Sequence, residues 1–511
     1  MQDSNNKKLL TNTVFLYART LLLLGLGLFT SRITMQALGV ENYGIINVVG
    51  GFVSMFALLS GSLTGACQRF ITFELGKADG NVRQIFSASF YIHLFLALLV
   101  GIIAETGGLY FLLEELNLPV EKMEEAQWVF HCSVVSFVLS LLNVPYSALI
   151  IAHEKMKAFA YISLVEAFFK FLTVSMILIS SINALILYSC LTLISSTLIR
   201  FTYQIYCIRT FKNEARLEVI KNRNHFKSIF GFAGWSFIGN SATILNGQGI
   251  NILLNLFVGV TVNAARGIST MVESVVLSFV NNFTTALNPQ ITKAYAQRDC
   301  ARLLELLDLG TRLSFFLMLI MIIPIVIVTS DILSVWLTVY PDYAIDFVRI
   351  TLVIALIQAM ANPYITAVNA TGSIRNYQLL VGGLTLLNIP FSYLALKLGF
   401  QPLCVYIISL FICLITFLIR LYFVQIKVNI TVGLVCKTIL YRLLPILLIA
   451  FGFSALFSYM IPTDNLVGLI SFGIVSCMIS LSLIYMIGLS KKEKNLLKVL
   501  VKSKVRNFYD R

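Results

Sequence analysis

The chain has 511 residues, of which 58% are hydrophobic and 12% charged, and its mean hydropathy is +0.86. Soluble domains carry roughly 25% charged residues, so this composition excludes a soluble enzyme, a nucleic-acid-binding protein and a disordered scaffold. The net charge of +14, from 38 Lys and Arg against 24 Asp and Glu, is therefore read first as a topology signal.

Apolar stretches long enough to cross a bilayer recur along the chain. A spanning helix needs roughly 20 mostly apolar residues, and the first stretch, which is too long for a signal peptide, has no cleavage site after it. Fourteen such segments are predicted, at 12–38, 44–75, 84–104, 123–151, 158–180, 182–207, 229–258, 262–290, 303–329, 345–370, 376–397, 401–424, 438–460 and 465–488. The predicted fold class is an all-α polytopic membrane protein with about fourteen transmembrane helices.

The basic residues between these segments predict their orientation. If both termini are cytoplasmic, the cytoplasmic segments hold 27 Lys and Arg, Arg420 among them, and the outside loops hold two, Lys122 and Lys397. Cytoplasmic loops of membrane proteins carry such an excess. We therefore expect cytoplasmic termini, an outside loop at 105–122, and a basic tail at 491–511 that faces lipid headgroups.

Matching residues at a common offset indicate an internal repeat. Gly39 and Val40 recur as Gly259 and Val260, and Ile71 recurs as Ile291, each 220 residues later. This offset spans six predicted helices, an even number, so the halves are expected to be parallel repeats. The predicted divisions are an N-terminal six-helix lobe at 1–210, a cytoplasmic basic linker at 211–228, a C-terminal six-helix lobe at 229–425, an extra helix pair at 426–490 and the tail at 491–511.

Nine basic residues remain inside the predicted helices. Four of them, Arg200, Arg312, Arg349 and Arg442, lie near helix ends and are expected to extend to the headgroups. Charge inside a membrane is expensive and usually functional. Arg19, Lys170 and Arg266 are therefore singled out, because polar residues share their helix faces.

The segment 262–290 carries a polar stripe. At 100° per residue its members fall within about 80° of one another; they are Arg266, Thr270, Glu273, Asn281, Thr284 and Asn288. Such a stripe cannot face lipid, so it either lines a lumen or holds an Arg266–Glu273 pair inside a packed interface. Asn240 and Asn251 lie on a similar strip of the segment 229–258.

The segment 158–180 holds Glu166 and Lys170 at the i,i+4 spacing of a helical ion pair. Such a pair neutralises itself, which favours a role in gating or ion coupling, shared with Glu273, over ligand binding. The inward-facing charges are net positive, and a cationic cavity suits a phosphate or pyrophosphate substrate. No enzyme motif, metal-ligand cluster or ATP-binding loop is present, so we expect no cofactor and no enzyme, with possible coupling to Na⁺ or H⁺.

Several motifs then resemble a known family. They are Asn12-Thr13, Tyr17, Arg19 and Thr30-Ser31-Arg32, with the segments 38–45, 68–77, 232–235, 263–268 and 288–293. The opening resembles that of bacterial polysaccharide flippases of the multidrug/oligosaccharidyl-lipid/polysaccharide exporter superfamily. The later segments look like its lipopolysaccharide or O-antigen branch, and the resemblance covers most of residues 10–425.

The resemblance implies two six-helix lobes that alternate access in the bacterial inner membrane. The cargo would be an undecaprenyl-pyrophosphate-linked glycan, such as an O-antigen or capsule unit, moved from the cytoplasmic to the outer leaflet. Its pyrophosphate would be held by Arg19, Arg69 and Arg266, with Arg32 as a further candidate. Membrane lipids and other surface-glycan assembly proteins would be its partners, and the last helix pair would hold the lipid tail.

Three alternatives remain. An ion-coupled multidrug extrusion transporter of the same superfamily would be expected to offer acidic lining residues, whereas this lining is net basic. A glycan polymerase or ligase would need a large outer-face domain, and the longest outside segment here is about 105–122. A channel fits the duplicated two-lobe pattern poorly.

Overall fold

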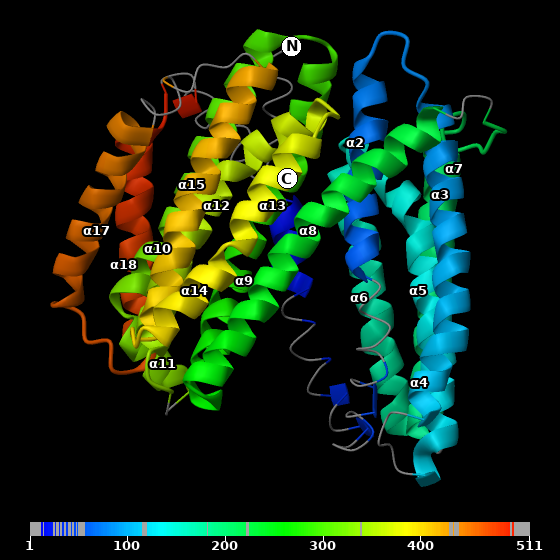
Figure 1. Ribbon diagram of the computed structural model, residues 1–511, viewed down its shortest axis with the longest axis horizontal. Coiled ribbons are helices and arrows are strands. Elements are labelled where there is room, and N and C mark those ends of the chain that lie inside the picture. Colours follow the sequence, from blue (N-terminus) through cyan, green and yellow to red (C-terminus); the bar gives the residue numbers. More distant parts are fainter. Residues whose placement is uncertain are drawn as a thin grey trace, which may run out of the picture. The chain divides into compact units, whose positions relative to one another are not determined.

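In the computed structural model in Figure 1, the described residues form helices joined by turns and loops, with no strand among them. The described ranges are 57–114, 120–180, 182–220, 224–337, 340–428, 439–490 and 493–494, with residue 433 and separate short runs between 12 and 49. The chain forms two compact units. Unit 2 comprises Leu9–Asn240 and Thr292–Asp299, and unit 1 contains Ser241–Ile291 and Cys300–Arg511.

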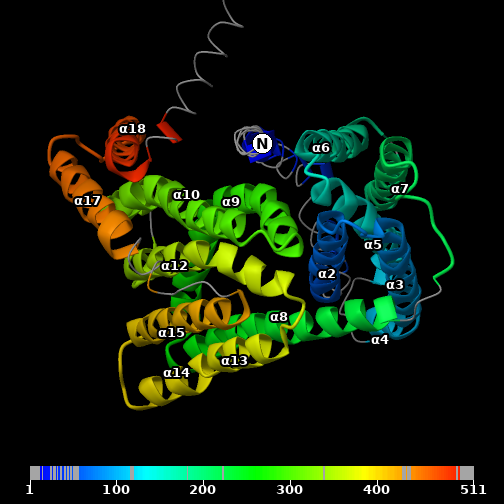
Figure 2. The same cartoon turned by 90° about the horizontal axis from the view of Figure 1, so that it is seen from above.

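Unit 2 is built around one central helix, α5. Its elements are α2 (Ala57–Gly76), α3 (Val82–Ile103), η1 (Ala104–Gly108), α4 (Leu109–Glu114), η2 (Val120–Lys122), α5 (Met123–Ala152), α6 (Met156–Ile179), α7 (Ala184–Thr210) and the first part of α8 (Asn224–Phe257). Figure 2 shows α5 surrounded by α2, α3, α6 and α7, and it contacts all four.

Unit 1 has α12 at its centre, in contact with α10 and α15. Its elements are the rest of α8, most of α9 (Val260–Ala296), α10 (Cys300–Ile327), α11 (Thr329–Leu337), α12 (Ala344–Ala370), α13 (Arg375–Leu386), α14 (Asn388–Lys397), α15 (Leu403–Val428), η3 (Ile439–Leu443), α17 (Leu444–Ser458), α18 (Leu466–Leu483) and η4 (Ile484–Gly488). The last pair, α17 and α18, packs against α10.

Asparagine side chains begin three of these helices. The Oδ1 atom of Asn81 accepts from the backbone N–H of Gln84 at 3.1 Å, and Asn183 caps α7 in the same way. At α18, Asn465 Oδ1 accepts from the N–H of Gly468 at 2.7 Å. Each cap satisfies an N–H that has no partner within its helix, so the sequence fixes these starts locally.

The predicted fold class is confirmed. Ten described helical stretches are long and apolar enough to cross a membrane, and the chain is a multi-pass membrane protein. Three other helices, α2, α8 and α9, have 20, 34 and 37 residues but are not among those ten. They are long enough to span, and their lower hydropathy comes from the Asn, Gly, Ser and charged residues that the sequence places there.

One predicted boundary is wrong. The outside loop expected at 105–122 is helical as far as Glu114, because α3 continues through the π-helical turn η1 into α4. The polar turn is held by Glu105, whose Oε2 lies 2.7 Å from His131 Nδ1 on α5. The segment predicted at 376–397 forms one span, Arg375–Lys397, within which a turn at Leu387 separates α13 from α14.

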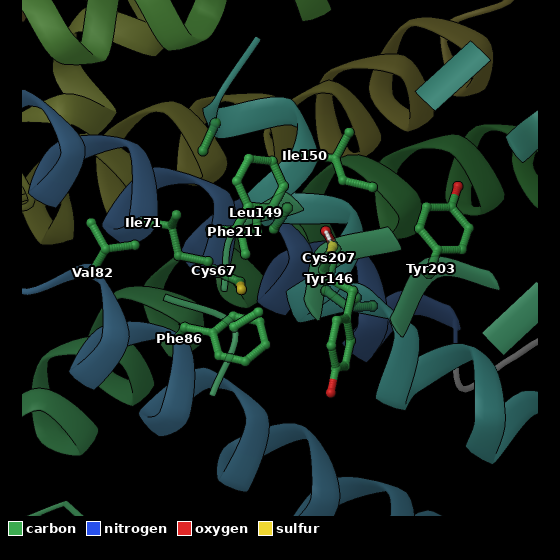
Figure 3. Close-up of a cluster of buried hydrophobic side chains, with 14 of the residues drawn as sticks. Cys67, Ile71, Val82, Phe86, Tyr146, Leu149, Ile150, Tyr203, Cys207 and Phe211 are labelled. Atoms are coloured by element: carbon green, nitrogen blue, oxygen red, sulfur yellow. Dashed lines mark hydrogen bonds between the residues drawn. The ribbon is translucent and has the colours of Figure 1, made fainter. Parts of the chain in front are cut away.

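The core of unit 2 is a cluster of buried apolar side chains between α2, α3, α5 and α7 (Figure 3). Its aromatic centre is Phe86 and Tyr146, whose rings meet edge to face at 5.2 Å between centroids. Aromatic pairs in this geometry add to the free energy of apolar burial. Tyr146 is therefore fixed in place by its neighbours.

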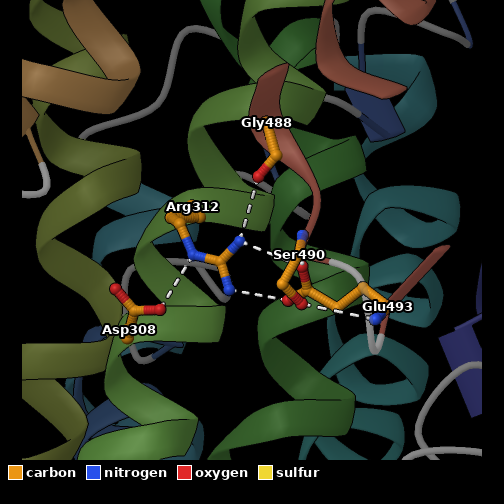
Figure 4. A network of polar contacts seen from close by, with 5 residues as sticks. All are labelled: Asp308, Arg312, Gly488, Ser490 and Glu493. Carbon is orange, nitrogen blue, oxygen red and sulfur yellow. Dashed lines mark hydrogen bonds and ion pairs between the residues drawn. The ribbon is translucent and has the colours of Figure 1, made fainter. Parts of the chain in front are cut away.

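Arg312 of α10 is a buried charge with a full set of partners (Figure 4). Its Nε donates to Asp308 Oδ2 at 2.8 Å, its Nη2 to Glu493 Oε1 at 2.6 Å, and its Nη1 to the carbonyl oxygen of Gly488 at 3.2 Å. The prediction that this arginine extends to the headgroups is wrong. The side chain instead ties the end of the last helix pair to α10.

The helix α9 passes from unit 1 to unit 2 between Ile291 and Thr292, just after Pro289. Its last turn is held closely in unit 2. Lys293 Nζ lies 2.9 Å from Glu154 Oε1 at the end of α5. A Cβ atom at Gly76 of α2 would stand 2.7 Å from Cβ of Ala296, so only glycine permits this approach.

Candidate functional site

Unit 1 encloses a polar cavity of about 370 Å³, here called the α9 cavity. Its charged lining residues are Arg266 and Glu273 from α9 and Arg420 from α15. Thr270 and Asn281 extend the polar wall along α9, as the predicted stripe requires. The polar stripe of 262–290 thus faces a cavity over part of its length.

Arg266 is oriented by the backbone of α8. Its Nη2 donates to the carbonyl oxygen of Gly247 at 3.1 Å. Within the described part of the chain no carboxylate forms an ion pair with Arg266, although Glu273 interacts with it electrostatically across the cavity. Of the two interpretations left open by the sequence, the geometry favours cavity lining over a closed Arg266–Glu273 pair.

The wall of the α9 cavity also contains a phenol. Tyr406 of α15 lies 3.1 Å, hydroxyl to hydroxyl, from the buried Ser269 of α9, and it interacts with Arg266. Its ring stacks on Phe347 with centroids 4.1 Å apart. A stacked, hydrogen-bonded phenol holds its position, so this wall presents donors and acceptors in a fixed arrangement.

Unit 2 contains two polar cavities that share part of their lining. The Arg19 cavity, of about 360 Å³, is lined by Arg19, Glu166 and Lys170 among others. The α7 cavity, of about 400 Å³, contains the same Glu166 and Lys170 together with Arg200 of α7. Glu166 Oε1 lies 2.9 Å from Lys170 Nζ, which confirms the predicted i,i+4 ion pair.

Arg19 is half-buried, with its guanidinium carbon 4.9 Å from the centroid of the Phe159 ring. Its Nε atom is buried and makes no hydrogen bond to any described residue. Glu166 lies within electrostatic reach. Arg19 therefore contributes a positive charge to unit 2 that no direct carboxylate contact within the described ranges removes.

Four predicted lining residues have protein partners and lie outside the lining of the cavities described above. Asn240 donates to Ser62 Oγ at 2.9 Å, and Asn251 donates to Gln248 Oε1 at 3.3 Å. Thr284 donates to the carbonyl oxygen of Asn281 at 3.1 Å, and Asn288 Oδ1 accepts from Thr366 at 2.9 Å. Their role in lining a substrate path stays a prediction.

Arg69 lies among aromatic rings. Its guanidinium carbon is 4.4 Å from the centroid of Phe70, 4.7 Å from that of Phe73 and 5.6 Å from that of Phe232. It lines none of the cavities described above, and its proposed substrate contact stays a prediction. Arg32 lies outside the described residues.

Two arginines of the cavities were missed. Arg420 was counted with a cytoplasmic segment, although it lies inside α15 and faces the α9 cavity. Arg200 was expected at the headgroups, but only 8% of it is exposed, so that expectation is wrong. Thr192 and Ser196 precede Arg200 at four-residue intervals and line the same cavity; this polar face of α7 was the available signal.

The described residues contain no group of three His, Cys, Asp or Glu that could hold a metal ion. The side chains that line the cavities offer charge and hydrogen bonds to a ligand. Five basic side chains, namely Arg19, Lys170, Arg200, Arg266 and Arg420, stand against the two carboxylates Glu166 and Glu273.

No family model and no curated protein matches the sequence. Solved structures do match in fold. One described as "Crystal structure of MATE in complex with MaD3S" has a TM-score of 0.70 at 12% identity, covering 83% of this chain and 96% of that chain. An outward-facing multidrug resistance MATE family transporter of the MOP superfamily gives 0.69 at 12% identity, covering 82% and 95%.

A third similar structure is a MOP superfamily transporter from Pyrococcus furiosus, for which reversed polarity of the binding pocket suggests a different function. Its TM-score is 0.65 at 12% identity, with 82% of this chain and 95% of that chain covered. This chain therefore has the fold of MATE transporters.

Proposed function

We propose that this chain is an alternating-access transporter that carries an anionic, lipid-linked glycan unit across the bacterial inner membrane. The observation that supports it is the charge of the cavities. In unit 1, Arg266 and Arg420 face one carboxylate, Glu273, inside a membrane-spanning fold. A surplus of arginine in such a cavity favours a phosphate or pyrophosphate, whose oxygens match the guanidinium fork.

In this proposal Arg266 binds the charged group of the cargo. Its Nη2 is already directed by the Gly247 carbonyl, so the remaining donors of the fork are held in position for an oxyanion. Arg420 forms the second positive wall. Glu273 would then respond to the Na⁺ or H⁺ that supplies the driving force, since it lies in the same cavity.

The second candidate is ion-coupled multidrug extrusion, favoured by the fold likeness to a multidrug resistance MATE transporter. In that function Glu273 and Glu166 would attract a cationic substrate, and the arginines would be secondary. The two candidates therefore differ in which charge of the α9 cavity is indispensable.

Transport by Arg266→Gln and Glu273→Gln variants separates the candidates. The assays are flipping of an undecaprenyl-pyrophosphate-linked sugar in proteoliposomes and ethidium efflux from cells. For glycan transport we expect Arg266→Gln to lose about tenfold or more, since a charge-assisted hydrogen bond is lost. Efflux that needs Glu273 and tolerates Arg266→Gln, without glycan flipping, would contradict the proposal.

Arg349→Gln is the matched control. Arg349 lies in the spanning helix α12 of the same unit, and its Nε donates to the carbonyl oxygen of Val326 at 3.2 Å. It lines none of the cavities described above. Glycan flipping should stay within about twofold of wild type in this variant, because a lost side-chain to backbone contact leaves the cavity charge unchanged.

A further inference from the structure

The α7 cavity of unit 2 has an unusual lining. Its walls include side chains from α5, α6 and α7, half of which carry hydroxyls, and Arg200 is the buried cation. Its volume of about 400 Å³ lies within the roughly 300–1,000 Å³ range of small-molecule pockets. Lys170 and Glu166 also face it, and they neutralise each other as an ion pair at 2.9 Å.

Arg200 is the charge that this cavity leaves uncompensated. The residue is 92% buried, and its Nη1 atom has no hydrogen-bond partner among the described residues. Its guanidinium carbon lies 4.5 Å from the centroid of the Tyr146 ring, which Phe86 fixes in the core. A buried guanidinium with an unused donor is costly unless an anion completes it.

The hydroxyls around Arg200 are oriented to accept. Ser140 donates to the carbonyl oxygen of Phe137, Ser195 to that of Leu191 and Ser196 to that of Thr192. A hydroxyl that has donated its hydrogen offers only lone pairs to a ligand. The wall of the α7 cavity is therefore complementary to a ligand that carries O–H donors.

Two further polar atoms of this wall lack partners. Asn143 Oδ1 and Ser136 Oγ, both on α5, are buried without a hydrogen bond to any described residue. They are seven residues apart, two helical turns, and both line the cavity with Arg200. Buried polar atoms in folded proteins are normally satisfied, so these atoms mark a place where a ligand or water completes the structure.

We infer that the α7 cavity binds the sugar-phosphate class of ligand, with the phosphate on Arg200 and the sugar hydroxyls on the Ser, Thr and Asn acceptors. The ligand could be a free sugar phosphate or the headgroup of a lipid, and both present the same chemistry. If the ligand is the headgroup of a transported lipid, this inference rests on the proposed function. The binding of a sugar phosphate itself is argued from the cavity lining alone.

Binding to the purified full-length protein in phosphatidylcholine nanodiscs tests the inference. The probes are glucose 1-phosphate, glucose and inorganic phosphate, measured by titration calorimetry. Glucose 1-phosphate should bind saturably and about tenfold or more tightly than either fragment, because only it satisfies both the cation and the acceptors. Equal binding of inorganic phosphate, or no binding of any probe, would overturn the inference.

Three variants locate the site. Arg200→Gln removes the charge, and Asn143→Asp places a carboxylate in the same wall, where it repels an anion while offering Arg200 a partner. Both should weaken glucose 1-phosphate binding by about tenfold or more, and Arg349→Gln should leave it within about twofold. Thermal unfolding shows whether each variant is folded. Wild-type affinity in a folded Asn143→Asp variant would place the ligand elsewhere.

The source of the ligand is distinguished by adding phosphatidylinositol to the nanodiscs. Weaker glucose 1-phosphate binding to the wild-type protein in these nanodiscs would show that a lipid headgroup enters from the bilayer, and unchanged binding would identify the free ligand. The flipping assay separates the two proposals. Arg200-dependent binding without glycan flipping would support this site and contradict the proposed function. Glycan flipping without sugar-phosphate binding would support the proposed function and contradict this site.

Discussion

Two buried arginines, one in each unit, differ in their polar partners. Arg312 in unit 1 is 4% exposed and is surrounded by Asp308, Glu493 and a backbone carbonyl. Arg200 in unit 2 is 8% exposed and has one aromatic ring and an unused Nη1 among the described residues. Burial alone therefore does not show whether a charged side chain has a structural role. Protein groups satisfy the guanidinium of Arg312, whereas that of Arg200 keeps an unused donor.

Removing Arg312 should have the largest effect. In Arg312→Met the carboxylates of Glu493 and Asp308 lose their partner, and we expect unfolding to become easier by about 2–3 kcal/mol, below the full value for a buried pair because both carboxylates are partly hydrated. Thermal unfolding of the purified protein measures this. A variant as stable as wild type would show that the Arg312 network contributes little.

Acid should weaken the same network. Burial by itself would raise the pKa of Glu493, but hydrogen bonds from Arg312 and from the Ser490 backbone hold it below its ordinary value. The unfolded chain then binds the extra proton first, so this contribution to stability is present above the ordinary Glu pKa and is lost as the pH falls through the lower, folded pKa.

We therefore expect the thermal stability to fall as the pH drops below about 4.3, the ordinary pKa of a Glu side chain. Glu493→Gln should reduce that dependence, since Gln does not titrate. Unfolding temperatures of both proteins between pH 7 and pH 3.5 provide the measurement. Parallel curves for the two proteins would assign the acid sensitivity to other carboxylates.

Two hydroxyl–hydroxyl contacts, one in each unit, should differ in the same way, with smaller effects on stability. Ser476 donates to Ser454 at 3.0 Å in unit 1, where both residues are fully buried, and Thr173 lies 3.3 Å from Ser195 in the α7 cavity. Ser476→Ala should cost about 1 kcal/mol, and Ser195→Ala less than half of that, because cavity water can replace the lost contact. A larger loss for Ser195→Ala would indicate a dry α7 cavity.

Removing Arg200 should change stability far less than removing Arg312. Arg200→Met removes a charge that has no carboxylate contact within the described ranges. We therefore expect the free energy of unfolding to change by no more than about 1 kcal/mol, in either direction. The measurement is the unfolding temperature without added sugar phosphate. A loss as large as that of Arg312→Met would mean that Arg200 has a structural role.

The sequence predicted the helices well because each spanning segment is a long apolar run, a property of neighbouring residues. The shared face of Arg266, Thr270 and Glu273 also followed from helical periodicity, and all three line the α9 cavity. The partners of other residues could not be read in this way. Asn288 meets Thr366 across 78 residues, and Arg200 is buried by helices whose packing is set elsewhere in the chain.

The path of α9 through both units has a mechanical consequence. With 37 residues it measures about 55 Å at 1.5 Å per residue, and its last turn is clamped in unit 2 by Lys293 and by the close approach at Gly76. Pro289 removes one backbone hydrogen bond just before the clamp. Because that hydrogen bond is missing, we expect α9 to bend most easily beside Pro289, outside the stretch that carries Arg266 and Glu273.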